Sequence, residues 1–514
     1  MALIVSLGAV VSMPPAVARA AAGDTVVTQD GPVSGTSVSG MRAFLGIPYA
    51  APPVGPLRWH PPEPHVRWSA PRDATRFANH CPQPAGYFGK ATDTEDCLYL
   101  NVFTPPGAAA RSSLPVMVWI HGGAFTTGES DDYNPVRFVG RNVVAVTLNY
   151  RLGRFGFFAQ TALDNEHHYK VNYGLMDQQR ALRWVQGNIR QFGGDPSRVT
   201  IFGESAGGLS VTSQLTSPKA AGLFGGAIVE SGDYQLTLPT LQASEQQGNA
   251  VAALIGCPNQ TASCLRSLTA KQILGSQSSA ESAGVVPTVD GDILQQSPST
   301  AFATGQFNRV PVINGSNHDE WRLFAALYFD LSSGPLTATA YPGAIAALVG
   351  PAAAPLVVKE YPVSRYPSPD LAYAAAGTDA IFACTAYGAD LSLTKYVPTY
   401  AYEFADENAP QPYLPRVSFP YAAAHASEIQ YLFESFKGDP PLTAAQRQLS
   451  QKMVGLWTGF AAHRAAWQSF GRGLGDELTL VPPQPIMTSG ASFAGYHKCA
   501  FWAALAAGGA ARAK

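Results

Sequence analysis

The sequence predicts an α/β fold with a mostly parallel central sheet flanked by helices. Short apolar runs rich in valine and isoleucine alternate with a segment of helical periodicity, which is typical of strands buried on both faces of a parallel sheet. Between two of these runs, residues 177–192 carry apolar side chains at helical spacing, and we expect Asp177 at the favourable amino end of that helix. The predicted strands are residues 116–120, 143–148, 199–202, 226–229 and 310–313.

The pattern changes after about residue 235, where small residues and short helical pieces replace the alternation. We expect two helical excursions from the sheet, at about 235–300 and 321–420, which form a cap and the walls of a pocket. A long helix is expected from Thr443 to about Phe470. No Ser/Gly-rich linker and no internal repeat divides the chain, so residues 23–514 are expected to form one domain.

Composition excludes several classes of protein. The net charge is −2 with no long run of either sign, so the chain lacks the electrostatic footprint of a nucleic-acid or anionic-membrane binder. A small neutral substrate fits this balance better. Forty-one prolines and 49 glycines imply the long irregular connections that build a pocket around a sheet.

Residues 1–22 resemble a secretory signal, because an apolar stretch is followed by the small-residue sequence Ala-Val-Ala-Arg-Ala. The stretch lacks a positively charged start, and the alternative is an unstructured apolar N-terminus. Elsewhere no apolar run reaches the roughly 18 residues of a membrane span. We therefore expect a secreted or periplasmic protein without a transmembrane segment.

The six cysteines are even in number and show no zinc-ligand spacing. Six cysteines allow fifteen pairings, but two close pairs stand out, and each would close a short loop. The remaining two would tie the C-terminal segment to the rest of the fold. The predicted pairs are Cys81 with Cys97, Cys257 with Cys264, and Cys384 with Cys499, the alternative being six reduced, buried thiols.

A glycine-flanked serine follows the predicted strand 199–202. The pentapeptide Gly-Glu-Ser-Ala-Gly at 203–207 leads into residues that can open a helix, and a strand, such a serine and a helix in this order describe a nucleophile elbow. In a glycine-rich chain this short motif also arises by chance. Ser205 is therefore a candidate nucleophile that needs an oxyanion hole, a base and an acid.

The oxyanion hole is expected in His-Gly-Gly-Ala-Phe at 121–125, directly after the strand that ends at Ile120. Backbone N–H groups of Gly122 and Gly123 would be two donors, and Ala206, the residue after the nucleophile, a third. The alternative is an ordinary glycine turn.

The acid and then the base should follow the serine in the chain. Of the four histidines after Ser205, His318 adjoins the acid candidates, His463 falls inside the long predicted helix, and His497 is close to Cys499. Elimination leaves His425, in a loop of small residues, as the base. Spacing does not decide between Asp319 and Glu320 as the acid.

Over almost its whole length the sequence resembles the type-B carboxylesterase/lipase family, which includes liver carboxylesterases, cholinesterases and bacterial p-nitrobenzyl esterases. The resemblance implies an α/β-hydrolase fold and ester hydrolysis through an acyl-enzyme, with no metal or organic cofactor. The matching blocks are Phe44–Ala50, Pro56–Trp59, Glu95–Val102, Asn149–Gly153, Asn172–Gln178 and Phe192–Pro196.

The resemblance also implies roles for single residues. It identifies Glu320 as the triad acid, His425 as the base and Ser231 as a serine that supports the triad. Two departures from the family pattern are Trp321 and Ala426, which stand where glycines are usual.

The same resemblance implies the three disulfides given above. The loop between Cys81 and Cys97 lacks the tryptophan that binds substrate in cholinesterases, which argues against a choline-specific site. The residues expected to line the substrate pocket are Tyr87, Phe88, Phe125 and Trp321.

These observations predict a serine hydrolase of small to medium neutral esters, a monomer or weak homo-oligomer whose partner is its small-molecule substrate. One alternative is a lipase acting on longer-chain glycerides. Another is a non-catalytic, cholinesterase-like binding protein, which predicts the loss of a triad residue, whereas serine, acid and histidine are all present.

Overall fold

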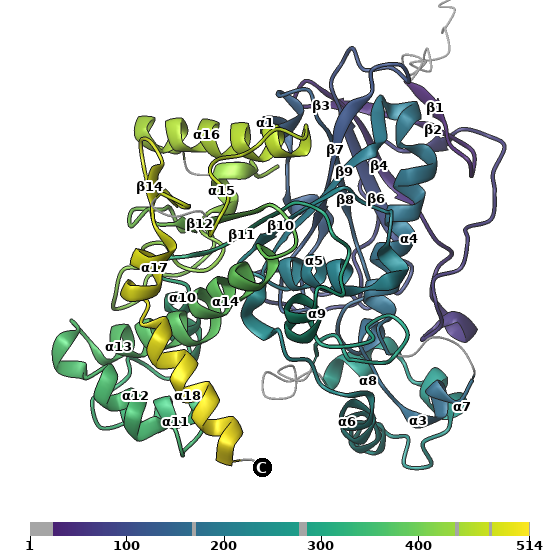
Figure 1. The fold of residues 1–514 in the computed structure, drawn as a ribbon. Helices are drawn as coiled ribbons and strands as arrows, with labels where there is room; N and C mark the ends of the chain where they lie inside the picture. The colour runs from purple at the N-terminus through teal and green to yellow at the C-terminus, as the bar shows by residue number, and fades with distance from the viewer. Residues whose placement is uncertain (1–23, 167–170, 277–284, 437–440, 472–474, 513–514) are drawn as a thin grey trace, which may run out of the picture.

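A computed structural model describes residues 24–166, 171–276, 285–436, 441–471 and 475–512 (Figure 1). The expected secretory signal at 1–22 lies outside the described residues. In the described part of the chain, no helix combines the length and the apolar character that crossing a bilayer requires.

A large twisted sheet forms the centre of the molecule. In the described residues it has eleven strands in the order β14-β13-β12-β11-β10-β9-β7-β8-β6-β4-β3, and neighbours from β13 to β8 are parallel, as predicted. The strands are β3 (Thr36–Val38), β4 (Met41–Pro48), β6 (Tyr99–Thr104), β7 (Leu114–Ile120), β8 (Val144–Leu148), β9 (Gly194–Glu204), β10 (Gly226–Glu230), β11 (Val312–Asn317), β12 (Thr399–Phe404), β13 (Glu477–Leu480) and β14 (Ile486–Thr488). A small separate sheet pairs β1 (Thr25–Val27), β2 (Pro32–Ser34) and β5 (Arg72–Asp73).

The sheet is covered on both faces, which explains why its central strands read as continuous apolar runs. In β7, Val116 and Val118 enter one hydrophobic core, while Met117 and Trp119 enter the other. The first core packs under α4 (Tyr173–Asn188) and α5 (Ala206–Thr216), and the second under α16 (Ala444–Ala461) (Figure 1). Alternate side chains of one strand thus stabilise two layers of helices.

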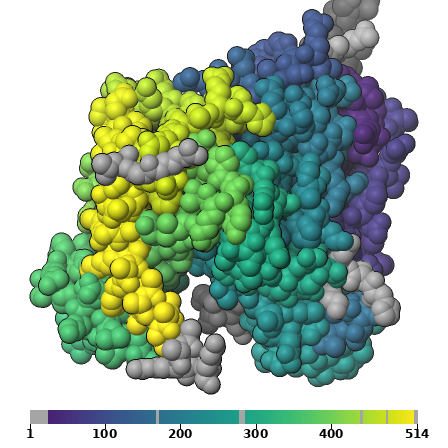
Figure 2. All heavy atoms as spheres, viewed as in Figure 1, coloured from purple at the N-terminus to yellow at the C-terminus, as the bar shows by residue number. Residues whose placement is uncertain are grey.

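Two groups of helices extend from the end of the sheet at which the parallel strands finish (Figure 1), and Figure 2 shows them as separate lobes. The first group contains α6 (Leu241–Leu254), α7 (Ala262–Ser267) and α8 (Ala270–Gly275). The second contains α10 (Trp321–Ala325), α11 (Tyr341–Val349), α12 (Ala354–Glu360) and α13 (Pro369–Gly377). Between the two groups, α14 (Cys384–Leu393) packs on β11 and β12, and α9 (Pro298–Thr304) packs on α5 and α14. The other helices are α1 (Val136–Val139), α2 (Gly153–Gly156), α3 (Thr161–Asp164), α15 (Ile429–Leu432), α17 (Gly490–Tyr496) and α18 (Cys499–Arg512).

Two predicted helices have different bounds. Helix α4 begins at Tyr173, so Asp177 lies inside it, buried, where its carboxylate accepts hydrogen bonds from the Arg151 guanidinium at 2.8 Å. The negative charge of Asp177 is therefore compensated by its pairing with Arg151 and not by the helix terminus. Helix α16 ends at Ala461, well before the predicted end near residue 470, and His463 follows it with φ 58°.

The second predicted helical excursion is also too long, because β12 at residues 399–404 belongs to the central sheet, parallel to β11. All three predicted disulfides are present: Cys81–Cys97, Cys257–Cys264 and Cys384–Cys499. The last one joins positions 115 residues apart and anchors α18 to α14.

Candidate active site

Ser205 occupies the turn between β9 and α5. Its φ and ψ are 57° and −123°, a region that residues with a side chain rarely adopt, and its N–H donates to the carbonyl of Glu230 on the neighbouring strand at 2.9 Å. The strand, the strained serine and the helix follow one another as the elbow motif predicts.

The glycines beside Ser205 are required by close packing. A Cβ atom on Gly203 or on Gly207 would lie 2.5 or 2.0 Å from the carbonyl oxygen of Ile120. Both distances are far below van der Waals contact, so any side chain would push β7 away from the elbow. This is the physical reason for small residues on both sides of the serine.

Residues 121–128, which we call the oxyanion segment, run past the serine. A Cβ atom on Gly122 would lie 3.1 Å from Cβ of Ser205, and Gly123 has φ 100°. Among the described residues, the N–H groups of Gly122 and Gly123 have no hydrogen-bond acceptor. Ala206 is the first residue of α5, where a helix leaves its N–H groups unpaired. The three expected donors are thus available next to Ser205.

His425 is held by a carboxylate. Its Nδ1 lies 2.5 Å from Oε2 of Glu320, and Oε1 of Glu320 accepts the backbone N–H of Asn317 at 2.8 Å. The rings of Phe324 and Phe382 flank the imidazole, with centroids 5.2 and 5.0 Å from its own. Packing and the hydrogen bond together fix the orientation of the imidazole.

Asp319, the other acid candidate, has different partners. Its carboxylate pairs with Arg322 at 2.7 Å and with His318 at 3.2 Å. The remaining histidines also lie elsewhere: His463 is exposed after α16, and His497 is buried between Asp379 and Glu403. Of the candidate pairs, Glu320 and His425 are the one whose histidine lines the cavity that Ser205 lines.

The second imidazole nitrogen, Nε2 of His425, has no hydrogen-bond partner among the described residues, although Oε1 of Glu204 lies 3.0 Å away. His425 and Ser205 line the same cavity. Burial lowers the pKa of His425, but the carboxylates of Glu204, Glu320 and Glu428 outweigh this effect and raise it to about 9. The acidic surroundings therefore stabilise the imidazolium form.

Three buried glutamates near the triad were not predicted as site residues. Burial raises the pKa of Glu204, of Glu428 and of Glu230 above the usual range of a glutamate. Glu230 accepts a hydrogen bond from Nε1 of Trp457 at 2.8 Å. The only signals in the sequence were the positions of Glu204 inside the elbow motif and of Glu428 close after His425.

Ser231 follows β10 with φ 50°, and its N–H donates to the carbonyl of Gly315 at 2.9 Å. Its buried hydroxyl has no hydrogen-bond partner among the described residues. The structure thus brings Ser231 to the edge of the sheet that carries the triad but gives it no hydrogen bond to Glu320 or His425.

The cavity over Ser205 is open to solvent, and its volume with the solvent at its mouth included is about 770 Å³. One wall is Leu323, Phe324 and Leu327, which follow the acid loop, and another is the oxyanion segment. Of the four residues expected to line the pocket, Phe88 does so, and Tyr87 lines an adjoining cleft that shares Phe88 with the cavity.

The other two expected pocket residues, Phe125 and Trp321, lie outside this lining. Phe125 is fully buried and packs on Phe157, with centroids 4.8 Å apart. Trp321 packs against Gly377 of α13, where a Cβ atom would lie 2.2 Å from the indole ring. The bulky residue after Glu320 therefore fills the core between helices instead of entering the pocket.

Parallel strands that carry a serine turn, an acid loop and a histidine loop to one edge of the sheet are the arrangement of α/β-hydrolases, and this fold is one of them. A solved structure of PNB esterase matches with TM-score 0.77 and 31% identity over 92% of this chain and 100% of that chain. A thermophilic PNB esterase matches with TM-score 0.78 and 30% identity over 93% and 100%.

The chain belongs to the carboxylesterase family, whose sequence profile matches residues 22–466. It is 37% identical over 455 residues to acylcarnitine hydrolase of Mus musculus, covering 83% of this chain and 79% of the relative. It is 35% identical over 457 residues to para-nitrobenzyl esterase of Bacillus subtilis (strain 168), covering 85% and 89%. The protein is therefore a carboxylic-ester hydrolase.

Proposed function

We propose that the protein hydrolyses small to medium neutral esters through an acyl-enzyme formed on Ser205, with His425 as base and Glu320 as orienting acid. The observation that carries this assignment is the 2.5 Å contact between Nδ1 of His425 and Glu320, in a cavity that His425 and Ser205 both line. Nε2 of His425 lies 3.0 Å from Oε1 of Glu204 but makes no hydrogen bond among the described residues. A base that is oriented through one ring nitrogen and makes no hydrogen bond through the other is what activation of a serine requires.

In the first half of the reaction, Nε2 of His425 takes the hydroxyl proton as Oγ of Ser205 attacks the ester carbonyl. The carbonyl carbon becomes tetrahedral, and its oxyanion accepts hydrogen bonds from the N–H groups of Gly122, Gly123 and Ala206. His425 then gives the proton to the departing alcohol. Water repeats the sequence, which releases the acid and restores the serine.

The lining of the cavity supports a neutral acyl group. No lysine or arginine lies among the lining residues described for the cavity over Ser205, and its walls are mainly aliphatic and aromatic. The relatives include a para-nitrobenzyl esterase, an acylcarnitine hydrolase and a cocaine esterase, whose names cover esters of very different size and charge.

A panel of p-nitrophenyl esters of increasing acyl length, run beside emulsified triglyceride, tests this substrate class. We expect hyperbolic kinetics on dissolved short and medium esters, because the cavity is open to monomeric substrate. Turnover that stays low on dissolved esters and rises abruptly at the solubility limit would instead identify a lipase that acts at an interface.

Replacing Glu204 by glutamine is expected to move the acid limb of the pH profile of kcat/KM to lower pH. The Glu204 carboxylate raises the pKa of His425, so its removal lowers that pKa and makes the neutral base available at lower pH. The exposed Glu407→Gln variant is the matched control, and its profile should overlay the wild type. A limb that stays in place or moves to higher pH in Glu204→Gln would contradict this electrostatic assignment.

A further inference from the structure

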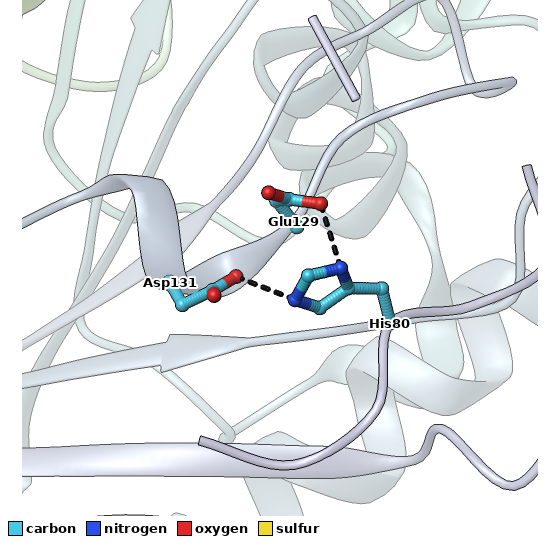
Figure 3. A group of neighbouring side chains, drawn as sticks. All are labelled: His80, Glu129 and Asp131. Atoms are coloured by element: carbon cyan, nitrogen blue, oxygen red, sulfur yellow. Dashed lines mark ion pairs between the residues drawn. The ribbon is translucent and has the colours of Figure 1, made fainter. Parts of the chain in front are cut away.

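A cluster of charged residues outside the triad joins two segments that border the cavity. Nδ1 of His80 lies 2.7 Å from Oε2 of Glu129, and its Nε2 lies 2.9 Å from Oδ1 of Asp131 (Figure 3). Nζ of Lys90 lies 3.1 Å from the other oxygen of Glu129. The cluster thus contains two cationic and two anionic side chains, and the Glu129 carboxylate is almost fully buried.

His80 directly precedes the loop closed by Cys81 and Cys97, which we call the disulfide hairpin (residues 81–97). Within it, Gln83 pairs with Thr92, and Gly86 with Gly89, as antiparallel bridges. The tip of the hairpin therefore carries Tyr87 and Phe88. Phe88 lines the cavity over Ser205.

The acidic partners of His80 follow the oxyanion segment without interruption, since Glu129 comes directly after Gly128. Gly128 and Gln83 also exchange two hydrogen bonds, of 2.8 and 3.1 Å. A Cβ atom on Gly128 would lie 2.3 Å from Nδ1 of His121 and 2.6 Å from the carbonyl of Gly122. The end of the oxyanion segment is therefore packed against its beginning, and the disulfide hairpin is attached at that point.

We propose that His80 is a positioning residue: held between Glu129 and Asp131, it fixes the disulfide hairpin to the oxyanion segment and thereby sets the place of Phe88 in the cavity. The inference rests on the proposed use of this cavity for substrate. The contacts with the carboxylates of Asp131 and Glu129 raise the pKa of His80 to about 9. Burial would raise the pKa of Glu129, but His80 and Lys90 lower it to about 2. At neutral pH His80 and Glu129 are therefore both charged.

Histidine, glutamate and aspartate are also a ligand set for divalent metals. The geometry favours the ion-pair network, because each ring nitrogen of His80 already faces a carboxylate oxygen and Lys90 binds the remaining oxygen of Glu129. A His80 imidazolium between the carboxylates of Glu129 and Asp131 stabilises the contact between their two segments without a metal ion.

The test compares His80→Gln with wild type on p-nitrophenyl acetate and p-nitrophenyl hexanoate. We expect KM for the hexanoate to rise about five- to tenfold, because its chain reaches the wall that Phe88 forms, while KM and kcat for the acetate change less than about twofold. Deuterium uptake by residues 82–92 should rise in the same variant. His80→Lys, which keeps a cation, should restore most of the KM, and His65→Gln, a partly exposed histidine of another segment, is the control.

Lys90→Gln is the second probe, because Lys90 is more than half exposed and its replacement leaves the core intact. It should shift KM in the same direction by a smaller factor, with the exposed Lys271→Gln as its control. Unchanged KM for the hexanoate in both variants, or an equal loss of kcat on both esters, would overturn the proposal. So would one equivalent of divalent metal in the purified wild type that His80→Gln loses. Labelling of Ser205 by an organophosphate in every variant separates failure of this inference from failure of the proposed function.

Discussion

Replacement of Ser205 by alanine is expected to lower kcat/KM on p-nitrophenyl butyrate by a factor of about 10⁵ to 10⁶, the loss typical of a removed nucleophile. The variant keeps the elbow glycines and the two hydrogen bonds of the turn backbone, so the fold should remain intact. Steady-state kinetics with the purified variant measure the loss, and thermal unfolding measures the fold.

The turnover that remains in the Ser205→Ala variant tests whether Ser205 is the nucleophile. Hydrolysis that remains within about tenfold of wild type in a folded, uncontaminated Ser205→Ala sample would contradict nucleophilic catalysis by this residue. Ser263→Ala, an exposed serine in α7, is the matched control and should hydrolyse the ester like the wild type.

The second large effect is expected for Glu320→Gln, which should lower kcat by a factor of about 10² to 10⁴. The amide nearly preserves the shape of the carboxylate, but it removes the negative charge that stabilises the His425 imidazolium, and it presents a donor to Nδ1. KM should change little, because Glu320 is fully buried beneath the imidazole and outside the cavity lining.

The Asp319→Asn variant changes the adjacent acid candidate and is compared with Glu320→Gln. Asp319 pairs with His318 and Arg322 and does not contact His425, so its replacement should cost turnover far less than that of Glu320. If Asp319→Asn is the more damaging change, the assignment of the acid is wrong. Thermal unfolding of both variants shows whether a loss of activity reflects a loss of structure.

The sequence predicts the parallel sheet well where burial alone selects the residues. The apolar run 143–148 contains β8, because both faces of the sheet are covered and the one polar residue of the strand, Thr147, is β-branched and buried in a hydrogen bond with Asn101. Strand β12 was missed because Glu403 interrupts its apolar pattern. Glu403 is buried there because it pairs with His497, which comes from a distant part of the chain, at 2.8 Å. A strand stabilised by a remote ion pair carries no local signal.

Helix ends depend on similar details. Helix α16 ends in a turn in which His463 N–H donates to the carbonyl of Phe460 and Arg464 N–H to that of Gly459. This pattern usually has glycine at the left-handed position, which histidine takes here, so the sequence lacks the usual stop signal. The start of α4 was misplaced because the partner of Asp177 is Arg151, on a separate segment.

Chain order and elimination predicted His425, and the resemblance to the carboxylesterase family predicted Glu320 over Asp319; the two side chains contact each other in the structure. The buried glutamates and the His80 cluster could not be predicted in the same way. Glu129 and His80 are unremarkable in the sequence, and only the fold brings them within 2.7 Å. Charge networks of this kind depend on distances between segments that no local pattern encodes.

Covalent labelling with diethyl p-nitrophenyl phosphate, followed by peptide mass spectrometry, tests most directly whether Ser205 is the nucleophile. We expect one diethylphosphoryl group per chain, on Ser205, with loss of activity in proportion to labelling. Full inhibition with the label on any other residue, or full labelling of Ser205 with activity retained, would contradict the assignment of Ser205 as nucleophile.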